Sequence, residues 1–147
     1  MPRMLWIAGG FVLLLVAFVV LSRMLTTNPA DFPSDPGLEN PLPVCPSSPN
    51  CVRVSRRVAM SPKAAWNAAH NALEAMGAAT IEGKAPILRH DAVFNAFVFK
   101  DDVTVVIEPD GDSSALHLRS ASRVGYSDLG VNARRVKRFF EAFAAQQ

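Results

Sequence analysis

One apolar run near the start of the chain constrains the molecule more than any other feature. It extends from Leu5 to Leu21 without a charged residue. At about 1.5 Å of rise per residue it would form a helix about 25 Å long, close to the shortest helix that crosses a hydrocarbon core about 30 Å thick. If the side chain of Arg23 reaches the lipid headgroups, the helix extends to Leu25. We therefore predict a single-pass transmembrane anchor over residues 1–25.

The basic residues at the two ends of this run predict its orientation. Arg3 and the terminal amine precede the run, whereas Arg23 alone follows it, and the more positive end stays in the cytoplasm. The N-terminus is then inside and the rest of the chain is extracytoplasmic, which means periplasmic in a Gram-negative cell. A cleavable signal peptide is the alternative. We favour a retained anchor, because the run exceeds the usual core of about 7–15 residues and no small-x-small site follows it closely.

Prolines dominate the next segment, residues 26–44, and forbid a regular helix there. An extended, semi-rigid linker is expected. Cys45 and Cys51 then bracket the turn-rich sequence Pro-Ser-Ser-Pro-Asn, which lets two sulfurs six positions apart meet. We favour a disulfide over two free thiols. A metal site is the weakest alternative, because the three histidines show no ligand spacing, and we expect no metal and no cofactor.

The remaining residues, 45–147, suffice for one domain with one core. Strands are expected at 52–59, 79–82, 86–99, 103–108 and 116–122, with helices at 61–77 and 132–144. The order β-α-β-β-β-β-α predicts an α+β domain, an antiparallel sheet of four to five strands with one or both of its two helices packed on a single face. Ser61 and Pro62 supply an N-cap and a first-turn proline, and Asn132 is expected to cap the second helix.

The apolar spacing within the two helices predicts which side chains form the core. In the first helix these are Trp66, Ala69, Leu73 and Met76, and in the second they are Val136, Phe139, Phe140, Phe143 and Ala144. The chain has a formal net charge of only +2, too small for a phosphate-binding surface, so we expect no nucleic-acid partner.

The densest polar cluster joins the last strand to the last helix, and it supplies most of the candidate ligand-binding residues. They are Arg119, Ser120, Ser122, Arg123, Tyr126, Asp128 and Asn132, with Asp101 and Asp102 on the preceding strand. Donors and two glycines near a helix N-terminus can receive an anion. The same groups can instead satisfy one another as ion pairs and turn caps. Both interpretations remain open at this stage.

Catalysis has weaker support in the sequence. Asp101 and Asp102 could form an acid–base pair, but adjacent strand residues point to opposite faces. Ser120 or Ser122 could be a nucleophile beside His117, but no nucleophile elbow accompanies them. The basic residues of the last helix form a solvated face or, alternatively, contact anionic lipid or an acidic partner; they are Arg134, Arg135, Lys137 and Arg138.

Three strings carry a family resemblance: Cys-Pro-Ser-Ser-Pro-Asn-Cys-Val from Cys45, Asp-Asp-Val from Asp101, and the segment 119–132 followed by Arg135. Together they resemble the domain-of-unknown-function family numbered 1499, over about residues 43–143. The resemblance implies a bacterial or chloroplast domain that often follows a membrane or export segment, and it implies no established activity. The chain departs from the family pattern at residues 52–54, where Val-Arg-Val stands in place of expected serines.

We therefore expect a membrane-anchored envelope protein, uncharacterised in activity, that acts as a non-enzymatic accessory or binding module. Its partners would be the membrane through residues 5–25 and a membrane protein or an anionic ligand. One alternative is a structural subunit of a membrane complex, with Gly9 and Gly10 packing against other helices. The other is a hydrolase or transferase acting on envelope material, with Asp101 or Asp128 as acid or base and Arg119 or Arg123 stabilising the developing negative charge.

Overall fold

The computed structural model describes residues 32–146. The predicted transmembrane anchor at residues 1–25 lies outside the described residues. Among the helices that are described, none is long and apolar enough to cross a membrane.

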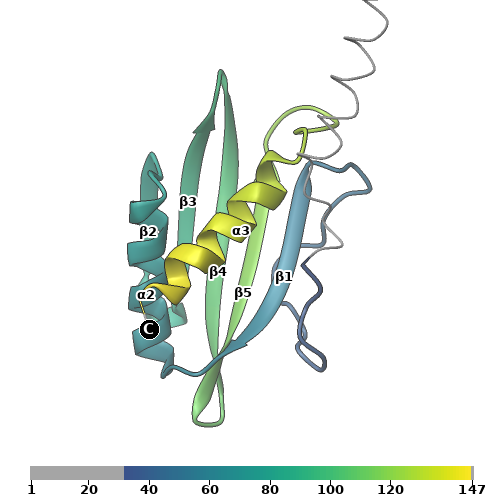
Figure 1. The fold of residues 1–147 in the computed structure, drawn as a ribbon. Coiled ribbons are helices and arrows are strands. Elements are labelled where there is room, and N and C mark those ends of the chain that lie inside the picture. The colour runs from purple at the N-terminus through teal and green to yellow at the C-terminus, as the bar shows by residue number, and fades with distance from the viewer. Residues whose placement is uncertain (1–31, 147) are drawn as a thin grey trace, which may run out of the picture.

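The domain is a five-stranded antiparallel sheet with two helices, and its elements follow the predicted order (Figure 1). In chain order they are β1 (Cys51–Val58), α2 (Pro62–Ala75), β2 (Thr80–Lys84), the short 3-10 helix η2 (Ala85–Ile87), β3 (Arg89–Ala96), β4 (Phe99–Asp110), β5 (Ser113–Ser122) and α3 (Val131–Ala144). The strand order across the sheet is β1-β5-β4-β3-β2, so the first strand pairs with the last. The run predicted as one strand at 86–99 is divided, because Leu88 has a positive φ of 45° after η2.

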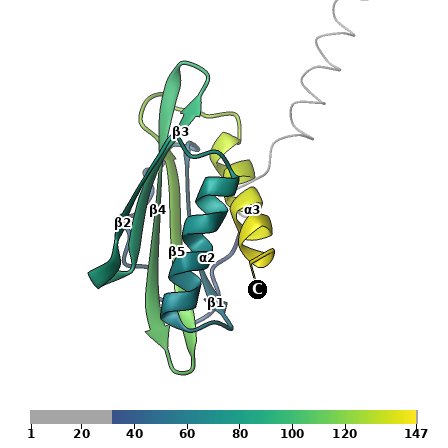
Figure 2. The ribbon, with the colours of Figure 1, turned by 90° about the vertical axis from the view of Figure 1, so that its left-hand side faces the viewer.

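Both helices pack on the same face of the sheet, and the other face is left without a helix (Figure 2). The period of two along each strand separates the faces. On β4, for example, Val103, Val105 and Ile107 are buried toward the helices, whereas Thr104 and Val106 alternate with them on the open face. The prediction of an α+β domain with an antiparallel sheet and two helices is therefore confirmed, and both helices share one face.

The first helix, α2, begins where its sequence signals placed it. Ser61 is the N-cap, and its hydroxyl accepts a hydrogen bond from the Ala64 amide at 3.4 Å. Its buried face consists mainly of alanines with Leu73, which lets the helix lie close to the sheet. Trp66 and Met76, which were predicted to be core residues, are only partly buried at the edge of this cluster.

The second helix, α3, corrects two expectations. Asn132 does not cap it: Gly130 is the N-cap residue with φ of 78°, and Asn132 is fully buried within the first turn. The carboxylate of Asp128 accepts from the Gly130 amide at 3.0 Å and from the Asn132 amide at 2.6 Å, so it bonds the free amides of the first turn. Val136, Phe139 and Phe143 are buried as predicted, Phe140 is partly buried and Ala144 is exposed.

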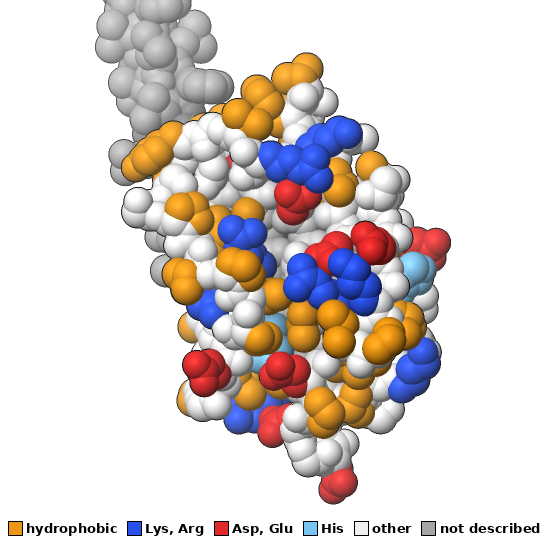
Figure 3. All heavy atoms as spheres, turned by 180° about the vertical axis from the view of Figure 1, so that it is seen from behind, with side chains coloured by type: hydrophobic (Ala, Val, Ile, Leu, Met, Phe, Trp, Pro, Cys, Tyr) orange, Lys and Arg blue, Asp and Glu red, His pale blue; other side chains and the backbone are white. Residues whose placement is uncertain are grey.

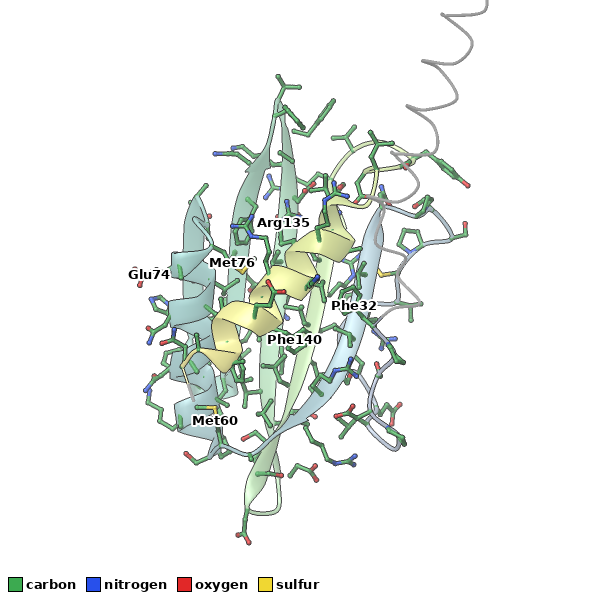
Figure 4. The ribbon with its side chains drawn as sticks, viewed as in Figure 1. Phe32, Met60, Glu74, Met76, Arg135 and Phe140 are labelled. Atoms are coloured by element: carbon green, nitrogen blue, oxygen red, sulfur yellow. A yellow bond between two sulfur atoms is a disulfide. The ribbon has the colours of Figure 1, made fainter. Side chains whose placement is uncertain are left out.

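The described part of the proline-rich segment, residues 32–44, lies along β1. The Asp35 amide donates to the Ser55 carbonyl at 2.9 Å, and the Asn40 amide side chain donates to the Val54 carbonyl at 3.1 Å. Phe32 packs against the core beside α3 and β1 (Figure 4). The prolines keep this segment free of regular helix, as expected, but from Phe32 onward it is attached to the domain.

Candidate functional site

A buried polar network lies beneath the first turn of α3, and it contains four of the predicted candidate residues. Asn132 is at its centre. Its side-chain oxygen accepts from the Ser120 hydroxyl at 2.5 Å, and its nitrogen donates to Ser122 at 2.9 Å and to Asp128 at 2.7 Å. The same nitrogen also lies 3.0 Å from the carbonyl oxygen of Asn50. The network thus ties β5 and the loop after it to the segment between the two cysteines.

Arg135 extends this network to β4. Its guanidinium donates to the Asp101 carboxylate at 2.7 Å and to the Asn132 side-chain oxygen at 2.7 Å, and it lies over the ring of Phe94. Figure 4 labels Arg135 on α3. Only 8% of Arg135 and 1% of Asp101 is exposed. Arg135 is therefore a buried ion-pair partner, and its predicted place on a solvated basic face is wrong. In the family resemblance, Arg135 follows the segment 119–132, which contains Ser120 and Asn132. This pattern is the signal in the sequence that associates Arg135 with the network.

The side chains of this network bond one another, and none of their buried polar atoms lacks a hydrogen-bond partner. A buried charge is tolerated when it is paired and hydrogen-bonded. Asp101 is thus occupied by Arg135, and Ser120 by Asn132. His117 is on the opposite face of the sheet, where its Nδ1 lies 2.8 Å from the Ser55 hydroxyl. The imagined serine–histidine pair is therefore not formed.

The disulfide predicted between Cys45 and Cys51 is present, and it closes the turn that leads into β1. Within this turn the Asn50 side chain donates to the Gly125 carbonyl at 2.5 Å and accepts from the Ser48 hydroxyl at 2.8 Å. The disulfide loop and the β5–α3 loop are therefore bonded to each other. Residues 32–146 contain no group of three or more His, Cys, Asp or Glu side chains that could hold a metal ion.

The second group of candidate residues lies on the open face of the sheet, around a hollow of about 460 Å³. Acidic and basic side chains gather around it (Figure 3). Asp102 and Arg123 are on its rim, joined by an ion pair of 2.7 Å, and this pairing raises the pKa of Arg123. Asp101 and Asp102 thus point to opposite faces, as the strand geometry predicted.

A second ion-pair cluster lines the same hollow on β3. Arg89 donates to both oxygens of Asp91, Lys84 lies 3.0 Å from the same carboxylate, and the Thr104 hydroxyl donates to it at 2.9 Å. These donors, Arg89 first, lower the pKa of Asp91 from 3.8 to about 2, although partial burial opposes the shift. The carboxylate is therefore ionised and fully occupied, which makes it unsuited to a general acid or base.

Two arginines on this face have no carboxylate partner in the described part of the chain. Arg53 on β1 and Arg119 on β5 are directly opposite each other in the register. The Nε atom of each is buried and has no hydrogen-bond partner. Arg53 donates through Nη2 to the Asn40 carbonyl, and the side chain of Arg119 has no hydrogen bond or ion pair within residues 32–146. Like charges facing each other across two strands repel, so the pair carries an uncompensated positive charge.

The polar segment after β5 indicates Arg119 as a candidate residue, but no pattern in the sequence indicates Arg53. Arg53 is part of the Val-Arg-Val string that replaces the expected serines, so its pairing with Arg119 depends on the strand register. Arg53 lines a smaller hollow of about 280 Å³ under residues 34–45, and Arg119 lines the larger one. Burial, together with the nearby Arg53 charge, lowers the pKa of His117 beside this pair, against the opposing effect of Glu108.

Tyr126, the last candidate, belongs to neither group. Three quarters of it is exposed (75%), and it projects from the β5–α3 loop.

The arrangement defines a small two-layer α+β domain with one open sheet face. Over residues 41–143 the sequence matches the model of the family described as protein of unknown function DUF1499. The chain belongs to this family, which confirms the resemblance expected from its sequence strings. The comparison with curated proteins gives no match. Among matching solved structures, TTHA0849 from Thermus thermophilus is 13% identical, with a TM-score of 0.47 and coverage of 65% of this chain and 95% of that one.

Proposed function

We propose that this chain is a non-enzymatic binding module of the cell envelope, anchored by the apolar run Leu5–Leu21, that holds a small anionic ligand on its open sheet face. One observation carries the proposal: Arg53 and Arg119 face each other, and neither forms an ion pair with a carboxylate of residues 32–146. The other basic residues around the larger hollow are already paired, Arg123 with Asp102 and Arg89 with Asp91. The unbalanced charge is therefore confined to the two facing arginines.

A phosphate or carboxylate group suits this position chemically. A guanidinium presents several N–H donors in a planar fork, which matches the oxygens of such groups in a bidentate manner. An anion between the two arginines would remove their repulsion and give partners to the buried Nε atoms. The hollows of about 280 and 460 Å³ leave room for a small organic anion beyond the charged group itself.

An enzymatic role has less support. Asp101 and Asp128 are the two carboxylates considered as acid or base. Asp101 is buried in an ion pair with Arg135, and Asp128 accepts from a backbone amide in the first turn of α3. Both carboxylates are therefore already engaged in bonds that hold the fold together. The open face offers positive charge and hydrogen-bond donors, which bind an anion without a group placed to transform it.

The experiment compares the full chain in detergent with two charge-matched variants, Arg119→Gln and Arg138→Gln. Arg138 is an exposed arginine on α3, remote from the open face, so its loss changes net charge equally. Unfolding temperature is measured with sodium phosphate replacing sodium chloride at constant ionic strength. We expect phosphate to stabilise the wild type and the Arg138 variant, and to leave the Arg119 variant unchanged.

The same variants also test the repulsion between the two arginines. Without phosphate, and at low ionic strength, Arg119→Gln should raise the unfolding temperature, because it removes the repulsion from Arg53. Arg138→Gln should not. If phosphate stabilises all three proteins equally, or if Arg119→Gln is destabilising in chloride, the two arginines are not an anion site.

A further inference from the structure

Six large apolar side chains are exposed together at one end of the domain, here called the apolar tip. They belong to the β3–β4 turn and the first residue of β4 (Phe97, Val98 and Phe99) and to the β5–α3 loop (Val124, Tyr126 and Leu129). Both segments lie at the end of the domain drawn uppermost in Figure 1. Phe97 is 99% exposed and Val98 is 87% exposed. A contiguous group of this kind on a small domain indicates a surface that contacts something apolar.

The two segments enclose a largely apolar hollow of about 560 Å³. Phe97, Phe99, Val124 and Leu129 line its walls. The tip is thus a pair of protruding segments with an apolar cleft between them. It is separate from the two hollows on the open face that carry the proposed anion site.

The backbone is strained at two positions of the tip. Phe97 has φ of 56° and Leu129 has φ of 53°, two of the three non-glycine residues with positive φ in the described chain. Phe97 and Val98 form a two-residue hairpin loop, for which glycine or asparagine is favoured at a positive φ. Large apolar residues in this conformation cost stability, and such strain persists where a function requires it.

The opposite end of the sheet has a different character. The β4–β5 turn there carries Asp110, Gly111 and Asp112, the acidic and glycine residues usual in an exposed turn. The long axis of the domain therefore runs from an apolar end to an acidic end, as the placement of the two turns in Figure 1 shows. An axis of this kind matches a domain with one end at a lipid surface and the other in water.

The length of the chain before the described residues places a membrane within reach of the tip. Leu25 and Phe32 are seven residue steps apart, which span at most about 25 Å. Phe32 enters the domain beside Pro33, whose carbonyl accepts from Arg56 in the second half of β1. From that level of the sheet to Phe99 is eight residues of β4, or about 27 Å. An extended segment from Leu25 therefore ends close to the level of Phe99, and the longer segment from Leu21, the last residue of the apolar run, reaches the tip.

We infer that the apolar tip is a second membrane contact, which inserts Phe97, Val98, Phe99, Val124, Tyr126 and Leu129 into the interfacial region of the bilayer that holds the anchor. Aromatic and aliphatic side chains beside basic ones are the composition that this region favours. Lys100 directly follows Phe99 and is exposed to meet the headgroups. The proximity of the tip to a membrane depends on the proposed anchor, whereas the exposure of the tip side chains and the backbone strain do not. The contact would fix the orientation of the open face relative to the membrane.

The test uses the full chain in vesicles of phosphatidylcholine and phosphatidylglycerol that contain a diazirine-bearing phospholipid. After photolysis, lipid adducts are located by mass spectrometry of peptides. We expect adducts on residues 5–25 and on both segments of the tip, and none above background on the β4–β5 turn. Adducts on residues 5–25 report on the anchor and adducts on the tip report on this inference, so the two can fail separately.

Two variants make the result specific. Phe97→Asn with Leu129→Asn places residues tolerant of positive φ at both strained positions, so the protein should unfold at the same or a higher temperature, and tip adducts should fall to the level of the β4–β5 turn. Ile87→Asn is the matched control, because Ile87 is a 59% exposed apolar residue in η2, outside the tip. It should leave tip adducts unchanged. Wild-type tip adducts no higher than those of the β4–β5 turn would overturn the inference, as would crosslinks joining the tip to a second copy of the chain instead of lipid.

Discussion

Two neighbouring aspartates on β4 offer a matched measurement of what burial does to an ion pair. Asp101 bonds Arg135 at 2.7 Å and Asp102 bonds Arg123 at the same 2.7 Å. The side chains differ in exposure: 2% for Asp101 and 45% for Asp102. We predict that Asp101→Asn is strongly destabilising and that Asp102→Asn is nearly neutral.

The magnitude follows from what each substitution leaves behind. Asp101→Asn preserves the shape and one acceptor, but it leaves the guanidinium of Arg135 buried without a counter-charge. Removing one partner of a buried pair costs about 3–5 kcal/mol. Because asparagine keeps one oxygen that can accept from Arg135, we expect a loss of about 3 kcal/mol, the lower end of this range. For a domain of this size that lowers the unfolding temperature by at least about 10 °C. Arg123 remains in water when Asp102 is replaced, and exposed pairs contribute little.

The assay is thermal unfolding of the full chain in detergent, followed by near-ultraviolet circular dichroism of the packed aromatic side chains. A third variant, Asp101→Asn with Arg135→Met, removes the uncompensated charge and should recover most of the lost stability. The reasoning would be refuted if Asp101→Asn and Asp102→Asn lowered the unfolding temperature equally. It would also be refuted if adding Arg135→Met made the Asp101 variant less stable.

Three further predictions concern covalent and titrating groups. Replacing both Cys45 and Cys51 with serine should cost about 2 kcal/mol, the loop-closure value for so short a loop, measured by urea unfolding against the oxidised wild type. Burial lowers the pKa of His90 and His117 below 6.5, so the unfolded chain takes up protons first as the pH falls. Stability should therefore be complete above about pH 6.5 and decrease below it, and a rise in the urea midpoint on acidification would contradict this. Asp91 has its pKa lowered from 3.8 to about 2, so its contribution should be lost between about pH 4 and pH 2, and Asp91→Asn should flatten that part of an acid titration.

The elements of the fold could be predicted because their signals are local. Ser61 and Pro62 mark the start of α2 through the preference of serine for the N-cap and of proline for the first turn. The short Cys45–Cys51 separation favoured the disulfide in the same way. The wrong cap at Asn132 has a specific cause. Asn and Asp both bond free helix amides, and only the position of Asp128, four residues before Asn132, decides which one does so.

The candidate site was harder to predict, because its geometry depends on the register of the sheet. The sequence gathers Arg119, Ser120 and Asn132 into one polar segment, but adjacent strand residues face opposite sides. Ser120 therefore enters the buried network with Asn132, whereas Arg119 is on the open face. Arg53 meets Arg119 only through the pairing of the first strand with the last, which joins residues 66 positions apart. No local pattern contains that information.

The buried network connects the two proposed contact surfaces. Asn132 holds Ser122 and Asp128 at the two ends of the β5–α3 loop, and that loop carries half of the apolar tip. Asn50, bonded to the same loop through Gly125, lies directly before β1, which carries Arg53. A rigid network at this point would fix the tip and the arginine pair relative to each other. The paired residues of the family string, Ser120, Ser122, Asp128 and Asn132, would therefore hold in place the two proposed surfaces on either side of them.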